Sequence, residues 1–135
     1  MTRYLLDTNI LSVIIRNPTG PVVQHLAEVG EKAVCTSIIV AAELRLGAKK
    51  RGSQRLTRQM ERVLDTLEIL PFDEPADVAY GTLRSLLEAA GTPIGANDML
   101  IAAHGLALGC TVVTDNEREF SRIEGLTIEN WLRSD

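Results

Sequence analysis

An apolar run that ends in a carboxylate and two helix-capping residues opens the chain, Tyr4-Leu5-Leu6-Asp7-Thr8-Asn9. A short apolar run bounded by polar residues is typical of a buried strand. Thr8 or Asn9 can cap a helix, and apolar residues then recur at helical spacing as far as Ile15. The stretch therefore predicts a strand over residues 3–6 that leads directly into a helix.

The same alternation of apolar runs and helical patterns continues along the chain. Further strands are expected at residues 33–36, 68–70, 111–114 and 126–128. Helical patterns fill the intervals, at residues 21–29, 38–48, 54–67, 75–90, 96–108 and, briefly, 116–120. Short strands that alternate with helices favour a parallel sheet covered on both faces. We therefore predict an α/β fold, a three-layer α/β/α sandwich around a short, mainly parallel sheet, in one domain over residues 1–135.

The helix expected at residues 38–48 is apolar nearly all round, which is typical of a buried helix. Glu43 lies in its middle. An ionised carboxylate is costly to bury without a partner, so Glu43 should meet either a cation or a nearby base such as Arg45. Asp98 has a similar setting, because Ile94, Ile101 and other apolar residues share its helix face.

Two further acids follow strands. Asp7 and Asp115 each come directly after an apolar run, which places them at the carboxyl ends of strands, where α/β sheets bind ligands. Each acid taken alone also fits an ordinary cap, turn or ion pair. Four carboxylates that converge cannot all ionise unless a cation compensates them, and all-oxygen sites suit Mg²⁺ or Mn²⁺. We therefore predict that Asp7, Glu43, Asp98 and Asp115 form a metal-binding site.

Polar residues beside these acids are candidates to orient ligands or substrate, although caps and turns would use the same residue types. They are Asn9, Ser37, Asn97, Thr114 and Asn116. His104 lies six residues beyond Asp98 and points about 120° away on an ideal helix, so we expect a packing or surface role for it.

The bulk composition is that of a globular protein, with 45% hydrophobic and 24% charged residues. No apolar run approaches the ~18 residues of a membrane span, and no signal-peptide layout is present, so a cytoplasmic protein is expected. Cys35 and Cys110 each lie in an apolar run, which favours buried, reduced thiols. Without a CxxC motif, a zinc site is not indicated.

Four stretches together resemble the PIN-domain ribonucleases, and specifically the VapC-type toxins of toxin–antitoxin pairs. They are Leu6-Asp7-Thr8-Asn9, Ser37 through Ala42-Glu43-Leu44, Ile94-Gly95-Ala96-Asn97-Asp98 with Ile101-Ala102-Ala103-His104, and Val113-Thr114-Asp115-Asn116 with Glu119-Phe120. They occur in the order of the family and span residues 4–131.

The resemblance implies a metal-dependent endoribonuclease that acts on structured RNA, commonly transfer RNA. It also implies a small VapB-like antitoxin as inhibitor and a homodimer. In such an enzyme Asp7, Glu43 and Asp98 would hold one or two Mg²⁺, with Asp115 completing the site. In-line attack by an activated water would leave a 5′-phosphate and a 3′-hydroxyl.

Residues 49–62 carry six basic side chains and only one acid, Glu61, in a chain with a net charge of −4. A local basic face can bind phosphates whatever the total charge. RNA contacts are therefore expected from Lys49, Lys50, Arg51, Arg55, Arg58 and Arg62. A solvated surface and a docking face for an acidic antitoxin segment are the alternatives.

Other functions fit the sequence less well. A receiver domain needs paired acids after the first strand and a late lysine, whereas no lysine follows Lys50. A haloacid-dehalogenase-like phosphatase needs Asp where Asn9 stands, and a dinucleotide-binding domain needs a GxGxxG turn. The remaining alternative is a PIN-like module that binds RNA or protein without cutting, against which the four acids argue.

Overall fold

The apolar run after Arg3 forms the central strand, β1 (Tyr4–Leu6), of the computed structural model, which describes residues 2–133. The other strands are β2 (Val34–Ser37), β3 (Glu68–Leu70), β4 (Thr111–Val113) and β5 (Ile128–Glu129). They lie in the order β3-β2-β1-β4-β5, and every neighbouring pair is parallel. Leu5 and Leu6 are fully buried, because the sheet is covered on both faces.

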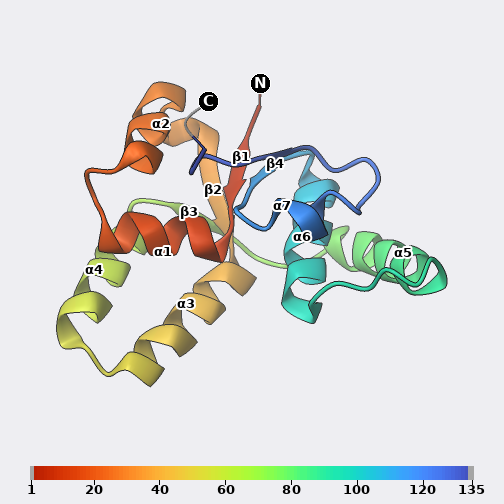
Figure 1. Ribbon diagram of the computed structural model, residues 1–135, viewed down its shortest axis with the longest axis horizontal. Helices are drawn as coiled ribbons and strands as arrows, with labels where there is room; N and C mark the ends of the chain where they lie inside the picture. The colour runs from red at the N-terminus through yellow and green to blue at the C-terminus, as the bar shows by residue number, and fades with distance from the viewer. Residues whose placement is uncertain (1, 134–135) are drawn as a thin grey trace.

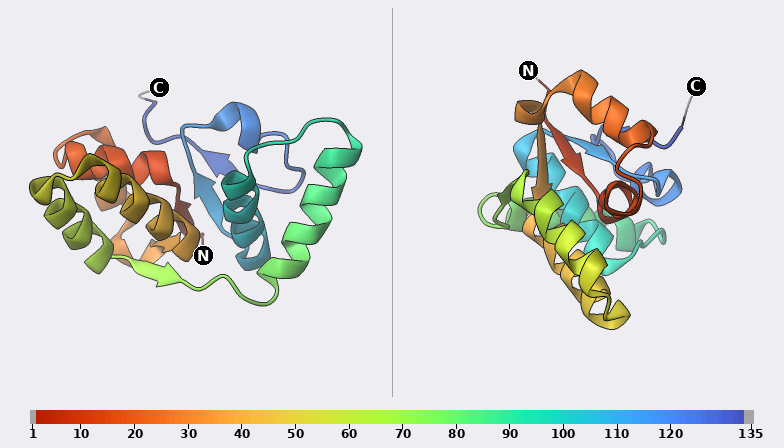
Figure 2. Two further views of the ribbon diagram at one scale, coloured as in Figure 1. Left: turned by 90° about the horizontal axis from the view of Figure 1, so that it is seen from below. Right: turned by 90° about the vertical axis from the view of Figure 1, so that its left-hand side faces the viewer.

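Helices form the two outer layers. They are α1 (Thr8–Arg16), α2 (Pro21–Val29), the 3-10 turn η1 (Glu31–Ala33), α3 (Ile38–Arg51), α4 (Gln54–Asp65), α5 (Ala76–Ala89), α6 (Ala96–Leu108) and α7 (Glu117–Phe120). Helices α1–α4 lie on one side of the sheet and α5–α7 on the other (Figures 1 and 2). The three-layer α/β/α fold expected from the sequence is confirmed.

The strand order reverses between β1 and β4. From β1 the chain adds β2 and then β3 on one side, and it returns through α5 and α6 to place β4 on the other side. In open α/β sheets the crevice at such a reversal, beyond the carboxyl ends of the strands, is the usual ligand site. Figure 1 shows the first turns of α1, α3 and α6 gathered at this end of β1. The residues that follow β1 and β4 therefore lie where a ligand site is expected.

Helix α6 lies unusually close to the sheet. A Cβ atom at Gly105 would come within 2.6 Å of Val112 Cγ2 on β4, so only glycine allows this approach. Ile101, Ala102 and Ala103 are fully buried beside it. The close packing fixes α6, and with it the first turn that carries Asp98, against the central strands.

The prediction that the third helix is buried nearly all round was wrong. Helix α3 buries Val40, Ala41 and Leu44, whereas Ile38 is 46% exposed and Leu46 is 56% exposed. The reason is tertiary: α3 packs on α1 and α4 along one side, and the α3–α4 hairpin (residues 38–65) extends away from the sheet (Figures 1 and 2). The helical periodicity of the sequence does not show whether a hairpin packs on the sheet or extends away from it.

Smaller differences concern the ends of elements. Helix α3 continues to Arg51 rather than ending at residue 48, and Gly52 closes it with a positive φ of 65°. The last strand is Ile128–Glu129 instead of residues 126–128. No helix in residues 2–133 is long and apolar enough to cross a membrane.

Candidate active site

Asp7 lies at the reversal point of the sheet and is 2% exposed. Its backbone N–H still bonds to Val113 of β4 at 2.9 Å, while its carboxylate caps α1 by accepting from the Thr8 N–H at 2.7 Å. The cap expected at Thr8 or Asn9 is therefore Asp7 itself. Its second oxygen accepts from the Thr114 hydroxyl at 2.7 Å. Burial raises the pKa of Asp7, these two hydrogen bonds oppose the rise, and the charge of Glu43 adds to it.

Glu43 reaches the same crevice from α3. The Thr8 hydroxyl donates to one of its oxygens, and the Asn97 amide donates to the other at 3.1 Å. The alternative partner Arg45 is engaged elsewhere, in an ion pair with Glu61. Glu43 is thus held by neutral donors from α1 and α6, which leave its negative charge uncompensated.

Asp98 enters from the first turn of α6 and is half-buried. The Asn116 amide donates to it at 3.0 Å. Burial, followed by the charge of Asp7, a hydrogen bond and charge from Glu119, and the charge of Glu43, raises the pKa of Asp98 to about 7. Burial is the largest of these causes, and repulsion from the neighbouring carboxylates adds to it.

Glu119 is the fourth member of this group, and it was not among the acids predicted from the sequence. It lies on α7, where the Asn116 amide donates to it at 2.8 Å while also bonding Asp98. The spacing Asn116-x-x-Glu119 was the available signal, since side chains three residues apart share a helix face. We refer to Asp7, Glu43, Asp98 and Glu119 as the acid cluster.

Asp115 does not join the acid cluster in this structure. Its side chain is exposed and accepts from the Asn130 amide at 3.0 Å, and its backbone N–H bonds to Asn9 at 3.2 Å. The reason is the alternation of an extended chain: Thr114 turns toward Asp7, so the next residue turns away.

The five supporting candidates all contact this region or the helices that form it. Asn97, Thr114 and Asn116 bond directly to acids of the cluster. Asn9 joins α1 to the loop after β4. Ser37 caps α3 and bonds to His104 at 2.8 Å. His104 is 1% exposed, so of the packing or surface role expected for it the surface role is excluded.

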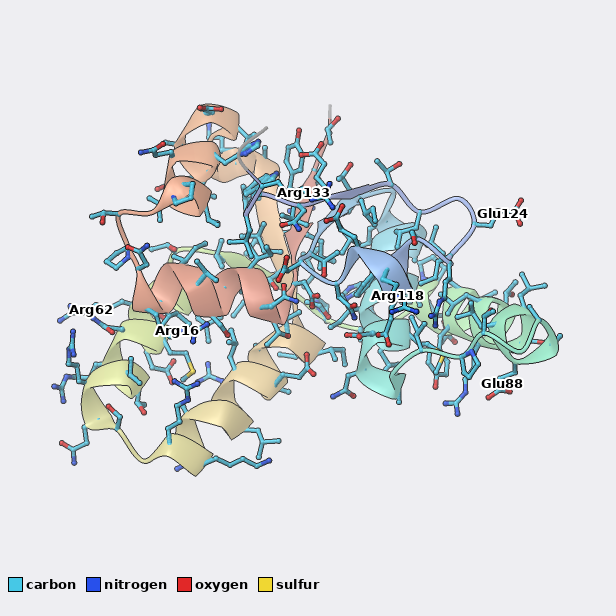
Figure 3. All side chains as sticks on the ribbon, viewed as in Figure 1. Arg16, Arg62, Glu88, Arg118, Glu124 and Arg133 are labelled. Carbon is cyan, nitrogen blue, oxygen red and sulfur yellow. The ribbon has the colours of Figure 1, made fainter. Side chains whose placement is uncertain are left out.

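The six basic residues predicted to contact RNA are exposed on the α3–α4 hairpin. Figure 3 shows Arg62 at the outer edge of that hairpin and Arg118 on the other side of the molecule, over α7. A hollow of about 220 Å³ between α1, α3 and α4 connects this region with the acids, since Thr8 and Glu43 line it together with Arg16 and Arg51. A surface of opposite charge therefore adjoins the acid cluster.

The donor chemistry of the acid cluster fits a hard divalent cation. All its members are carboxylates, and the pKa of Asp98 is raised by burial and by the negative charge of its neighbours, which a cation would neutralise. Within residues 2–133, however, no three acidic, histidine or cysteine side chains are grouped as a ready-made metal site. The carboxylates instead accept hydrogen bonds from neutral hydroxyl and amide donors, such as Thr8, Asn97 and Asn116.

The chain is similar over most of its length to one family of known proteins. The family model "PIN domain" matches residues 4–126. A tRNA(fMet)-specific endonuclease VapC of Salmonella typhimurium is 36% identical, over 97% of this chain and 99% of the relative. Ribonuclease VapC2 of Rickettsia felis is 38% identical, over 95% and 97%.

Solved structures agree with the sequence matches. The fold is similar to that of VapBC2 from Rickettsia felis bound to a promoter DNA fragment, with a TM-score of 0.88 over 96% of this chain and 99% of that one. DNA-bound VapBC from Salmonella typhimurium gives a TM-score of 0.87 at 36% identity, over 97% and 99%. The chain is a PIN domain. Within that class it belongs to the VapC ribonuclease family, as the resemblance in the sequence indicated.

Proposed function

We propose that this chain is a divalent-metal-dependent endoribonuclease toxin that hydrolyses phosphodiester bonds of structured RNA, acting as one domain over residues 1–135. The observation that carries the proposal is the convergence of the acid cluster from β1, α3, α6 and α7 at the reversal point of a parallel sheet. Burial and the charges of neighbouring acids together raise the pKa of Asp98 to about 7, and ionised carboxylates in such a setting do not stabilise the fold. Their cost is explained if the site works with a cation.

Asp7, Glu43 and Asp98 would hold Mg²⁺ or Mn²⁺, and Glu119 takes the place that the sequence assigned to Asp115. The ion would supply a water of lowered pKa and polarise the scissile phosphate. Asp7 is fixed from two sides and provides the rigid corner of the site. Asn97 of α6 orients Glu43, and Asn116 at the start of α7 orients Asp98. Products with a 5′-phosphate and a 3′-hydroxyl are expected.

Cleavage should require a divalent cation and the acid cluster. The experiment incubates the protein with a transfer RNA mixture in Mg²⁺, in Mn²⁺ or in EDTA, with Asp7→Ala as the control variant, and maps the RNA ends. We expect defined cuts with Mg²⁺ or Mn²⁺ and none with EDTA or with the variant. Binding of RNA without any cut in the presence of either metal would favour the alternative, a non-catalytic PIN-like module.

Transfer RNA is the proposed substrate. The name of the Salmonella relative specifies tRNA(fMet), and that protein aligns over nearly the whole chain. The basic residues of the α3–α4 hairpin and the hollow between α1, α3 and α4 offer phosphate contacts beside the acid cluster. Contacts of this kind fix the position of an RNA without reading its sequence.

Replacing Arg55, Arg58 and Arg62 together by Ala should raise the KM for RNA about tenfold and leave kcat nearly unchanged, because these side chains would bind phosphates away from the reacting bond. The salt dependence of RNA binding should also become shallower, by a slope of about 2. Steady-state kinetics at several salt concentrations measure both effects.

A control variant removes the same charge elsewhere. Lys32, Arg84 and Arg133 are basic residues outside the α3–α4 hairpin, and their replacement by Ala should leave KM within about twofold. Equal effects of the two triple variants would mean that only net charge matters. An unchanged KM in the hairpin variant would remove these residues from the RNA site.

A VapB-like antitoxin is the proposed partner, because the similar structures are toxin–antitoxin complexes. A homodimer is also proposed. Val78 and Leu86 of α5 are 66% and 62% exposed, which supports a further contact surface on that side of the sheet. A cytoplasmic location follows from an RNA substrate, and the free thiols of Cys35 and Cys110 agree with it.

A further inference from the structure

His104 is a buried histidine that no part of the proposed chemistry uses. It lies in the middle of α6 and is 1% exposed, and its Nδ1 atom is 2.8 Å from the Ser37 hydroxyl oxygen. The ring of Phe72 packs edge-on against it, with centroids 5.4 Å apart. The backbone of Pro71 forms a further hydrogen bond with the imidazole. A buried ring with this many fixed partners has a defined orientation.

The direction of each hydrogen bond can be assigned. Burial lowers the pKa of His104, and the Pro71 bond and the charge of Asp73 oppose this only in part, so the ring is neutral at pH 7. Proline has no N–H, so the ring N–H must donate to the Pro71 carbonyl. The Nδ1 atom is then an acceptor, and the Ser37 hydroxyl donates to it. The Ser37 oxygen in turn accepts from the Ile39 N–H at 3.0 Å.

This chain of bonds joins the two helices that carry acids of the cluster. Ser37 caps α3, and Glu43 follows six residues later. His104 lies on α6, six residues after Asp98. Each acid is therefore about 9 Å along its helix from the Ser37–His104 bond. Because α3 and α6 belong to opposite layers of the sandwich, few other polar contacts fix one against the other; the bond from Asn97 to Glu43 is one.

We propose that His104 is a positioning residue of the ribonuclease site: through Ser37 it sets α3 against α6 and so holds Glu43 and Asp98 at the separation at which they share one cation. The inference rests on the proposed function, since it assigns His104 to the same site. A histidine suits the task because its neutral ring accepts from Ser37 on one side and donates to Pro71 on the other. An aliphatic residue of similar size would fill the space without fixing the register of the two helices.

The test compares two substitutions at this position. His104→Phe keeps a ring against Phe72 but removes both hydrogen bonds, whereas His104→Asn retains an amide oxygen that can accept from Ser37. We expect His104→Phe to weaken Mn²⁺ binding, measured calorimetrically without RNA, by about tenfold or more, and to lower kcat similarly, since residues that orient metal ligands have effects of about 10- to 100-fold. KM for RNA should stay within about twofold. His104→Asn should recover most of both losses.

His25→Phe is the matched control, because His25 is the other histidine of the chain and stacks on Trp131 beside α2. It should leave Mn²⁺ binding and kcat unchanged. Wild-type Mn²⁺ affinity and kcat per folded molecule in His104→Phe would overturn the proposal, and so would losses that His104→Asn does not reduce. If His104→Phe does not fold, Ser37→Ala removes the same bond from the other helix, and wild-type Mn²⁺ affinity in that variant would overturn the proposal.

The two readouts separate this inference from the proposed function. A wild-type protein that binds Mn²⁺ but cuts no RNA would refute the ribonuclease proposal, while the Mn²⁺ affinities of the variants would still decide whether His104 positions the acids. Cleavage by the wild type with equal Mn²⁺ affinity and kcat in all variants would leave the ribonuclease proposal standing and refute the role of His104.

Discussion

Asp98→Asn is expected to lower RNA cleavage by more than about 100-fold while the protein stays folded. Even residues that only orient a metal ligand are worth about 10- to 100-fold, and Asp98 would be a ligand itself. The amide is nearly isosteric with the carboxylate, so the packing around α6 should not change. Single-turnover cleavage of transfer RNA in Mg²⁺, with circular dichroism as the check on folding, measures the effect. Wild-type activity in this variant would remove Asp98 from the catalytic site.

The same substitution should stabilise the metal-free protein at pH 8. The pKa of Asp98 is about 7 in the folded protein against an ordinary value of 3.8, so between these values the folded state binds more protons than the unfolded state. The free energy of unfolding therefore falls as the pH rises from about 4 to about 7. After a discount for solvent screening at this half-buried site, the loss is about 1–2 kcal/mol.

Thermal unfolding in EDTA at pH 5.5 and pH 8 measures the upper half of this loss. The wild type should be less stable at pH 8, and Asp98→Asn should show a smaller pH dependence and a higher melting temperature at pH 8. Some dependence should remain, because burial also raises the pKa of Asp7. A variant less stable than the wild type at pH 8 would contradict the cost assigned to the ionised Asp98 carboxylate. Together, lost activity and gained stability would indicate a site whose charges serve function rather than folding.

The fold could be predicted from the sequence because its signals are local. Each strand is a short apolar run between helical patterns, and β1, β2 and β4 lie within one or two residues of the expected positions. The apolar character of α3 was equally clear but misleading. Its exposed side, including Leu46, depends on where the α3–α4 hairpin lies relative to the sheet, which is a property of the tertiary structure.

The site was predictable where an acid contradicted its surroundings. Glu43 and Asp98 stand out on apolar helix faces, and Asp7 follows a buried strand. Glu119 gives no such contrast, because it lies in a charged four-residue helix, between Arg118 and the buried Phe120. The direction of its side chain is set by the burial of Phe120 and by the Asn116 amide, which donates one hydrogen bond to Glu119 and another to Asp98; only the folded chain shows these contacts.

Glu119→Gln and Asp115→Asn decide which residue is the fourth acid. Each substitution removes one negative charge near the end of β4, so net charge is matched. Glu119 raises the pKa of Asp98 directly, whereas Asp115 is exposed and bonded to Asn130. Glu119→Gln should therefore weaken Mn²⁺ binding and lower kcat/KM by about 10- to 100-fold, and Asp115→Asn should change either by no more than about threefold.

A second consequence separates a metal ligand from a residue that merely affects the charge of the site. Removing the Glu119 charge should lower the pKa of Asp98, and the metal-free Glu119→Gln protein should then lose less stability between pH 5.5 and pH 8. Asp115→Asn should leave that pH dependence unchanged. If Asp115→Asn instead abolished Mn²⁺ binding while Glu119→Gln retained it, the four acids predicted from the sequence would be the correct set, and the loop after β4 would have to rearrange when the cation binds.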